Sequence, residues 1–420
     1  MGAPRPTLRG RDVLAITVGI VIGAGIFRTP AVVAGAAGSE LALILAWVAG
    51  GLLSIVGALC YGELASAYPA VGGDYHFLER AYGPRIAFLY GWARLAVIQT
   101  GSMALLAYVF GDYLAAILPI GTHSSSIYAA CAILLVTAIN WVGIRLGARV
   151  QRWLTIAEVA GLVVVILAGL MLAPADAAPR SVGGDSAAGL MMVFVLLTFG
   201  GWSEAVYVSA ELKDAPRRMG WIMVAGLALV TLLFVLANIA FLRALGLGGM
   251  AASDAVAAEV MRRAMGDAGA ALVSLTVAIA AFTSANATAI TGARTACALG
   301  RNFKQLRWLA RWESGRETPG NALVAQGGVA LLLVAVGALA PDGFRLAVEY
   351  TAPVFWFFLL LVGISLFVLR AREPERPRPF RVPLYPLLPA IFCLTSLYLL
   401  YSSVAYSGMG ALVGIAVLGA

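Results

Sequence analysis

Apolar stretches of about 20 residues alternate with short polar segments along the whole chain. Each stretch is long enough to cross the roughly 30 Å hydrocarbon core of a bilayer as a helix. The short, strictly alternating segments of a membrane β-barrel are not evident. The pattern therefore predicts an all-α polytopic membrane protein with twelve spans, at 12–37, 40–66, 85–117, 125–143, 152–173, 187–211, 219–245, 268–299, 322–340, 346–370, 384–402 and 404–420.

Composition strengthens this interpretation. Of the 420 residues, 61% are hydrophobic and 12% are charged, and the mean hydropathy is +0.91. A soluble domain has about 25% charged residues. The short stretch before the first span lacks the pattern of a cleaved signal peptide, so we expect none.

The net charge of +8 could suggest a nucleic-acid partner, but the distribution of the basic residues argues against one. In the twelve-span arrangement, 22 of the 29 Lys and Arg residues lie on one side and 5 on the other. Short cytoplasmic loops are enriched in Lys and Arg. We therefore expect both termini in the cytoplasm, the chain in the cytoplasmic (inner) membrane, and anionic lipid headgroups beside the basic side.

Metal, cofactor and ATP chemistry find no support in the sequence. The four cysteines fall within or beside apolar spans, their spacing fits no metal site, and the two histidines fall in predicted loops. No stretch resembles the Walker loop that binds nucleotide phosphates. We expect no metal, no cofactor and no enzymatic activity.

Two of the predicted spans are weakened near their centres by glycine. The first, in "ITVGIVIGAGIFRTP", contains Gly23-Ala24-Gly25, and the sixth contains Gly200-Gly201, 177 residues later. Shifting the second span, 40–66, by the same offset gives 217–243, which nearly matches the seventh. Paired interruptions at corresponding positions of two halves indicate a transporter site. The alternative is that such glycines serve close helix packing, for which Gly19 and Gly23 have the required spacing.

The offset predicts four parts. They are a cytoplasmic N-terminal tail (1–11), a first repeat of five spans (12–173), a second repeat of five spans (187–370) and two appended helices (384–420). Because five is odd, the two repeats have opposite orientations in the membrane.

A broken helix exposes backbone groups that can bind a small polar ligand. The N-terminus of the resumed half-helix carries partial positive charge and free N–H donors, which suit a carboxylate. The C-terminus of the other half offers carbonyls to a cation or an ammonium group. Two facing breaks would therefore suit a zwitterion such as an α-amino acid, and glycine allows close approach to the backbone.

Five motifs in order resemble the amino acid–polyamine–organocation (APC) permeases. They are "GIVIGAGIFRTPA", "YGELASAYPAVGGDYHFLERAYGP", "FGGWSEAVYVSAELKDAPRR", "SANATAITGARTACALGRN" and "LRAREPERPRPFRVPLYPLLP". The sixth-span wording is similar to the L-type amino acid transporter branch and its bacterial relatives. The resemblance covers nearly the whole chain and implies a five-plus-five inverted repeat, with the first and sixth helices broken and two helices appended.

The resemblance also implies the substrate contacts. The resumed first span takes the carboxylate, the break in the sixth span takes the amino group, and Trp202 closes the pocket from outside; ordinary aromatic packing is the alternative for Trp202. The implied substrate-binding residues are Ile22, Gly23, Ala24, Gly25 and Ile26 in the first span and Phe199, Gly200, Gly201 and Trp202 in the sixth.

Glu158 departs from the family pattern. Around it, "VQRWLTIAEVAGL" resembles the family's fifth span, where many members have a lysine. The resemblance makes Ser284 its expected neighbour. We hypothesise that Glu158 gains and loses a proton during transport; a glutamate held neutral by hydrogen bonds to the first or eighth span is the alternative.

Other charges within spans are also candidates, because a charge in a bilayer is costly. Glu204, just after the sixth-span break, could line the pathway, and its carboxylate keeps a basic substrate possible. Arg28 could be an outer gate or could extend to the headgroups. Arg94 is expected to pair with a carboxylate that the sequence does not identify, and Glu63 to lie within reach of headgroups or a loop cation.

Together these features predict a secondary-active permease that moves L-amino acids by alternating access, through proton symport or amino acid exchange. A polyamine or other organic-cation transporter, or an amino acid sensor that does not transport, is the alternative. The expected partners are an amino acid, protons in the case of symport, and membrane lipids. The sequence does not predict the oligomeric state.

Overall fold

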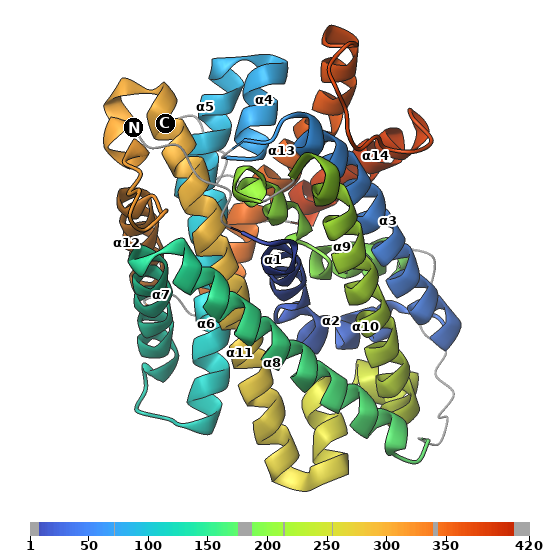
Figure 1. Ribbon diagram of the computed structural model, residues 1–420. Coiled ribbons are helices and arrows are strands. Elements are labelled where there is room, and N and C mark those ends of the chain that lie inside the picture. Colours follow the sequence, from blue (N-terminus) through green and yellow to red (C-terminus); the bar gives the residue numbers. More distant parts are fainter. Residues whose placement is uncertain are drawn as a thin grey trace.

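The computed structural model describes residues 8–70, 72–174, 187–212, 215–253, 255–338 and 343–406 (Figure 1). Within these ranges the chain is helical, and β-structure is limited to two isolated bridges. Helices follow from the long apolar runs, because a helix satisfies its own backbone hydrogen bonds inside a bilayer.

The first half begins with the broken span α1–α2, and a short π-helix lies within its third span. Its elements are α1 (Gly10–Ile22), α2 (Gly25–Ala36), α3 (Glu40–Ala67), α4 (Asp74–Tyr82), α5 (Pro84–Ala93), the π-helix η1 (Arg94–Ile98), α6 (Gln99–Ile117), α7 (Ser124–Val142) and α8 (Ile144–Met171).

The second half begins with the second broken span. Its elements are α9 (Ala187–Thr198), the 3₁₀-helix η2 (Trp202–Glu211), α10 (Ala215–Ala251), α11 (Val256–Asn302), the 3₁₀-helix η3 (Lys304–Ala310), α12 (Gly320–Gly337), α13 (Gly343–Arg372) and α14 (Leu387–Tyr406).

Ten helices of the described chain are long and apolar enough to cross a membrane, or eleven if the bent pair α1–α2 is one span. These eleven correspond to the first eleven predicted spans. Most of the twelfth, 404–420, lies outside the described residues. The predicted break at residue 403 is wrong, because α14 continues through it to Tyr406. The Ser403 hydroxyl donates to the Leu400 carbonyl (2.9 Å), so this polar position is accommodated within the helix.

Helix α11 forms the centre of the bundle (Figure 1). Every residue from 280 to 300 is buried, and most are Ala, Ser, Thr or Gly. Small side chains let neighbouring helices approach closely. Helix α1 is held between α8, α10, α11 and η2, while α2 packs on α9 and α10. Both halves of the first broken span therefore lie inside the bundle.

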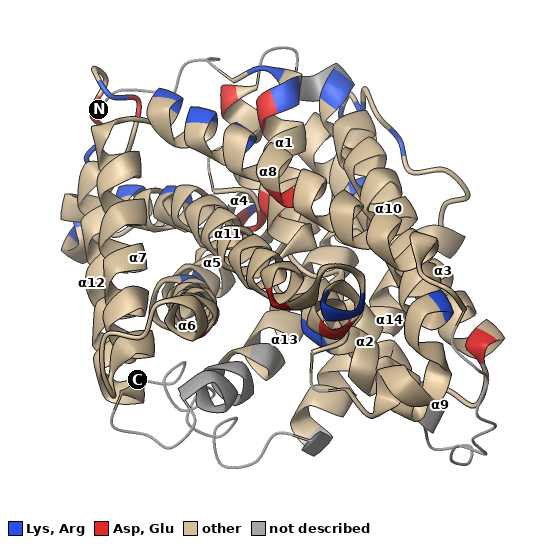
Figure 2. Ribbon diagram, turned by 90° about the horizontal axis from the view of Figure 1, so that it is seen from below, with Lys and Arg blue, Asp and Glu red and all other residues tan. Residues whose placement is uncertain are grey.

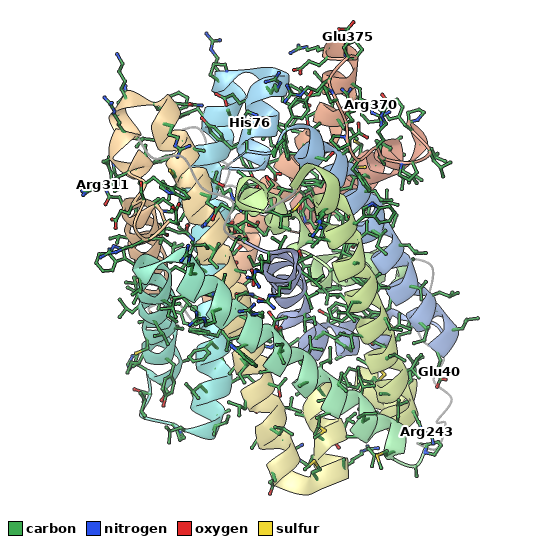
Figure 3. All side chains as sticks on the ribbon, in the orientation of Figure 1. Glu40, His76, Arg243, Arg311, Arg370 and Glu375 are labelled. Carbon is green, nitrogen blue, oxygen red and sulfur yellow. The ribbon has the colours of Figure 1, made fainter. Side chains whose placement is uncertain are left out.

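Charged residues lie mainly toward two opposite ends of the molecule. Figure 2 shows that they are sparse along the helices. Figure 3 places its labelled residues in two groups, with His76, Arg311, Arg370 and Glu375 toward the upper end and Glu40 and Arg243 toward the lower end. This grouping agrees with the two sides to which the twelve-span arrangement assigns the arginines.

Candidate functional site: two facing helix breaks

The first break separates α1 from α2. The two helices meet at a bend of 42°, and Gly23 between them has a non-helical conformation (φ 11°, ψ −173°). The Ser284 hydroxyl of α11 donates to the Gly19 carbonyl (3.1 Å) at the end of α1. This hydrogen bond satisfies a carbonyl group close to the break.

The second break separates α9 from η2. Gly201 adopts the left-handed conformation, with φ of 95°, which glycine reaches without steric cost. The Glu204 N–H donates to the Gly201 carbonyl (3.0 Å), and this bond starts the 3₁₀-helix. The glycine pair noted in the sequence therefore ends one helix and begins another.

The two breaks face each other. A Cβ placed on Gly25 would lie 3.0 Å from Thr198 Cγ2, and one on Gly201 would lie 3.3 Å from Ile20 Cγ1. The Thr198 hydroxyl also donates to the Thr29 hydroxyl (2.8 Å). The backbone of each break is thus within van der Waals reach of the other broken helix.

The structure brings the nine predicted substrate contacts to these breaks. The most accessible are Ala24, Gly25, Gly200 and Gly201, all partly exposed, whereas the large side chains at Ile22, Ile26 and Phe199 are buried. The accessible part of the site is therefore mainly backbone, as ligand binding by helix termini requires.

Trp202 packs against α3 and α14. Its ring meets Tyr61 edge-on, with centroids 5.1 Å apart, and Phe392 with centroids 6.1 Å apart. This is the aromatic packing considered as the alternative to an outer lid.

Beside the second break lies a mainly apolar cavity with an empty volume of about 420 Å³, counting the part open to solvent. Its walls come from α3, the α9–η2 junction, α13 and α14. Trp356 and Phe392 are among the lining residues. The sequence analysis missed these two aromatics, because an aromatic residue within a span does not reveal which space it borders.

Arg94 and Glu204 form a buried ion pair between η1 and η2, with side chains 3% and 7% exposed. Glu204 also accepts hydrogen bonds from Thr291 and from Gln99 (3.3 Å). The Arg94 guanidinium lies 3.8 Å from the centre of the Tyr207 ring. The partner that sequence reasoning could not identify for Arg94 is therefore Glu204.

Two other buried carboxylates also meet arginines. Glu211, at the end of η2, pairs with Arg294 of α11 (2.8 Å between Oε2 and Nη2). Glu63 of α3 accepts from Arg370 Nε (2.7 Å) and lies 3.3 Å from Arg378 Nε. The expectation that Glu63 meets a cation near the end of its span is confirmed.

Glu158 has a different environment. It is fully buried on α8, and neither carboxylate oxygen has a hydrogen-bond partner within the part of the chain that the structure describes. Ser284, its expected neighbour, donates instead to the carbonyls of α1. Arg28 is exposed on α2, with its guanidinium 5.6 Å from the centre of the Tyr113 ring.

The site offers backbone donors, backbone acceptors and a few hydroxyls. Across the described ranges, no group of three or more His, Cys, Asp or Glu residues could hold a metal ion. The arrangement is suited to reversible binding of a small polar molecule.

A bundle of membrane-length helices with two glycine-broken helices facing each other defines a secondary carrier with a central binding site. Comparison with known proteins identifies the particular family. The family model described as "Amino acid permease" matches residues 8–414. The chain belongs to this family, which makes it an amino acid transporter and not an enzyme.

Its relatives are transporters of several kinds. The chain is 30% identical to the mouse b(0,+)-type amino acid transporter 1 over 405 residues, covering 93% of this chain and 81% of the relative. It is 27% identical to the serine/threonine exchanger SteT of Bacillus subtilis (strain 168), over 96% and 93% of the two chains. It is 30% identical to the mouse large neutral amino acids transporter small subunit 2, over 96% and 77%.

Proposed function

We propose that the protein binds an α-amino acid between the two helix breaks and carries it across the membrane by alternating access. The observation that supports this most directly is the pair of facing breaks, with partly exposed backbone at Ala24, Gly25, Gly200 and Gly201. The N–H groups that begin α2 would hold the carboxylate, because a helix N-terminus attracts anions. The carbonyls near the breaks would hold the ammonium group.

Exchange of one amino acid for another is the favoured mode of transport. The support is the similarity to a serine/threonine exchanger over nearly the full length of both chains. Proton symport is a second candidate, because the buried Glu158 has, among the described residues, none of the hydrogen-bond partners that a permanently structural role would lead us to expect.

The orientation is also part of the proposal. We place the chain in the cytoplasmic membrane with both termini in the cytoplasm and an inverted pair of five-span repeats. The matched breaks at Gly23 and Gly200 support the repeats, and the basic-residue asymmetry supports the orientation.

Cysteines replacing Thr122 and Lys304, in a background without native cysteines, should label from opposite sides of the membrane. Labelling of both from one side would contradict this arrangement.

Counterflow in proteoliposomes tests the function. The purified protein is reconstituted with each of the twenty amino acids inside, and uptake of the same labelled amino acid is measured. For the best substrate, two analogues follow, namely the amine without the carboxylate and the acid without the amino group. We expect exchange of the amino acid and at least a tenfold weaker effect of either analogue, since each loses one of the two helix ends.

Other outcomes would favour other functions. Exchange of the amine as fast as the amino acid, together with uptake of putrescine, would favour an organic-cation transporter. Saturable binding without flux would favour a sensor. Both outcomes would contradict the proposed function.

A further inference from the structure

The third span contains an unusual turn where it passes the second break. Helix α5 continues into α6 through the π-helix η1, in which the Gln99 N–H bonds to the Arg94 carbonyl five residues earlier. In an α-helix of 3.6 residues per turn, side chains five apart point about 140° away from each other. The i→i+5 bond of a π turn stacks the two residues instead, and such turns are frequent at functional sites.

This turn directs two donors at one carboxylate. Arg94 and Gln99 both donate to Oε2 of Glu204, and Thr291 of α11 donates to the same atom. Because the carboxylate and the guanidinium are both almost fully buried, neither is screened by bulk water. The two charges of the pair offset each other, and Asp74, which Tyr61 and Tyr90 hold by hydrogen bonds, is a further acid that interacts with both.

The pair lies close to the proposed amino acid site. Glu204 follows Gly201 by three residues, which is one turn of the 3₁₀-helix and a rise of about 6 Å. A basic substrate side chain with a flexible four-carbon stem could span this distance. Without its arginine, Glu204 would therefore offer such a substrate a counter-charge.

We propose that Arg94 is a specificity-determining residue, which restricts the site to amino acids with uncharged side chains by neutralising Glu204. This inference rests on the proposed function and adds a substrate class to it. While the pair is intact, neither a cationic nor an anionic substrate side chain finds an unpaired counter-charge in it. Specificity that depends on unfavourable contacts with the wrong ligand is common in proteins.

Charge-removal variants test this role. Arg94→Gln leaves a carboxylate near the site, Glu204→Gln leaves a guanidinium, and the double variant leaves neither charge. Arg294→Gln is the matched control, because it breaks the other buried ion pair of η2, in which Arg294 of α11 meets Glu211, seven residues farther along the chain than Glu204. Thermal unfolding in detergent confirms that each variant is folded.

The measurement is competition for counterflow of the best neutral amino acid by lysine and by glutamate. We express each result as the ratio of the half-inhibitory concentrations of the charged and neutral competitors, so that changes in total activity cancel. In Arg94→Gln the lysine ratio should fall at least tenfold. In Glu204→Gln the glutamate ratio should fall at least tenfold, whereas the double variant and Arg294→Gln should keep the native ratios.

Two results would overturn the inference. One is a native protein that exchanges lysine or glutamate as well as neutral amino acids. The other is a native lysine ratio in folded Arg94→Gln, or a native glutamate ratio in Glu204→Gln. If Arg94→Gln does not fold, the glutamate ratios of Glu204→Gln and the double variant decide. A native protein that exchanges no amino acid would instead refute the proposed function, and this outcome is distinct from an altered ratio.

Discussion

Helix α2 offers a matched pair of glycines for testing the site. Gly25 begins the helix at the first break, where an added Cβ would lie 3.0 Å from Thr198 Cγ2. Gly35 lies ten residues later on the same helix, with no atom within 4 Å of an added Cβ. We predict that Gly25→Val loses amino acid binding, whereas Gly35→Val binds as the native protein does.

The structure sets the expected magnitudes. Carbon atoms in favourable contact are about 3.5–4.0 Å apart, so the first carbon added at Gly25 must displace Thr198 by several tenths of an ångström. Overpacking of this kind costs about 1–3 kcal/mol. Replacing a helical glycine by valine returns about 0.3–0.5 kcal/mol. Gly25→Val should therefore be destabilised by about 0.5–2.7 kcal/mol, and Gly35→Val should be slightly more stable than the native protein.

Binding should respond more strongly than stability. The valine methyls would occupy the gap in which the substrate meets the backbone, so we expect at least a tenfold loss of affinity, or about 1.4 kcal/mol. The assay is isothermal titration with the best amino acid, alongside thermal unfolding without ligand. Native affinity in a folded Gly25→Val would refute the assignment of the site to the breaks, and a comparable loss in Gly35→Val would show a non-specific effect.

A substitution at Gly201 would not separate an effect on binding from an effect on stability. The φ of 95° at Gly201 makes a β-branched residue there a clear outlier, and such strain costs about 1–3 kcal/mol. Gly201→Val should therefore lose binding and stability together. Gly25, which has no such backbone strain, separates the two effects.

Three further predictions concern ionisable groups. In proteoliposomes, Glu158→Gln should lose accumulation driven by an inward proton gradient but keep exchange; accumulation equal to that of the native protein would refute a proton role. Arg370→Gln should destabilise the protein by about 1.5–3 kcal/mol, because it removes charge-assisted hydrogen bonds to the buried Glu63, which keeps Arg378 as its second cation. Arg80 belongs to an exposed ion pair, which should contribute about 0–1 kcal/mol to stability. Equal unfolding temperatures for Arg370→Gln and Arg80→Gln would therefore contradict this reasoning. Burial raises the pKa of Asp74, in the segment between the second and third spans, to about 6. The usual pKa is about 3.9, so the folded state favours the protonated form and stability should fall as the pH rises from about 4 through 6. Thermal unfolding at pH 5 and pH 7.5 measures this fall, and Asp74→Asn should reduce it; an equal fall in the variant would contradict the assignment.

The spans and the breaks could be predicted from the sequence because their causes are local. A run of about 20 apolar residues specifies a membrane helix whatever surrounds it. Gly23 and Gly201 interrupt their helices through the backbone freedom of glycine. The boundary expected at residue 403 was misplaced, because the Ser403 hydroxyl bonds within the helix and α14 continues to Tyr406.

The network around Glu204 could not be predicted, because its causes are not local. Arg94 and Glu204 are 110 residues apart, and no pattern in either segment marks them as partners. The π turn is equally hidden, since "RLAVI" is an ordinary apolar stretch that would fit an α-helix. Its i→i+5 bond accompanies tertiary contacts that only the folded chain provides.

The buried carboxylates of the described spans fall into two kinds. Glu63, Glu204 and Glu211 each meet an arginine, whereas Glu158 meets neither a cation nor a hydrogen-bond donor within the described residues. Desolvation of a carboxylate costs several kcal/mol, and an adjacent arginine offsets much of this cost. Glu158 has no such compensation among the described residues, and we therefore propose it as the residue at which proton binding and a conformational change would be coupled.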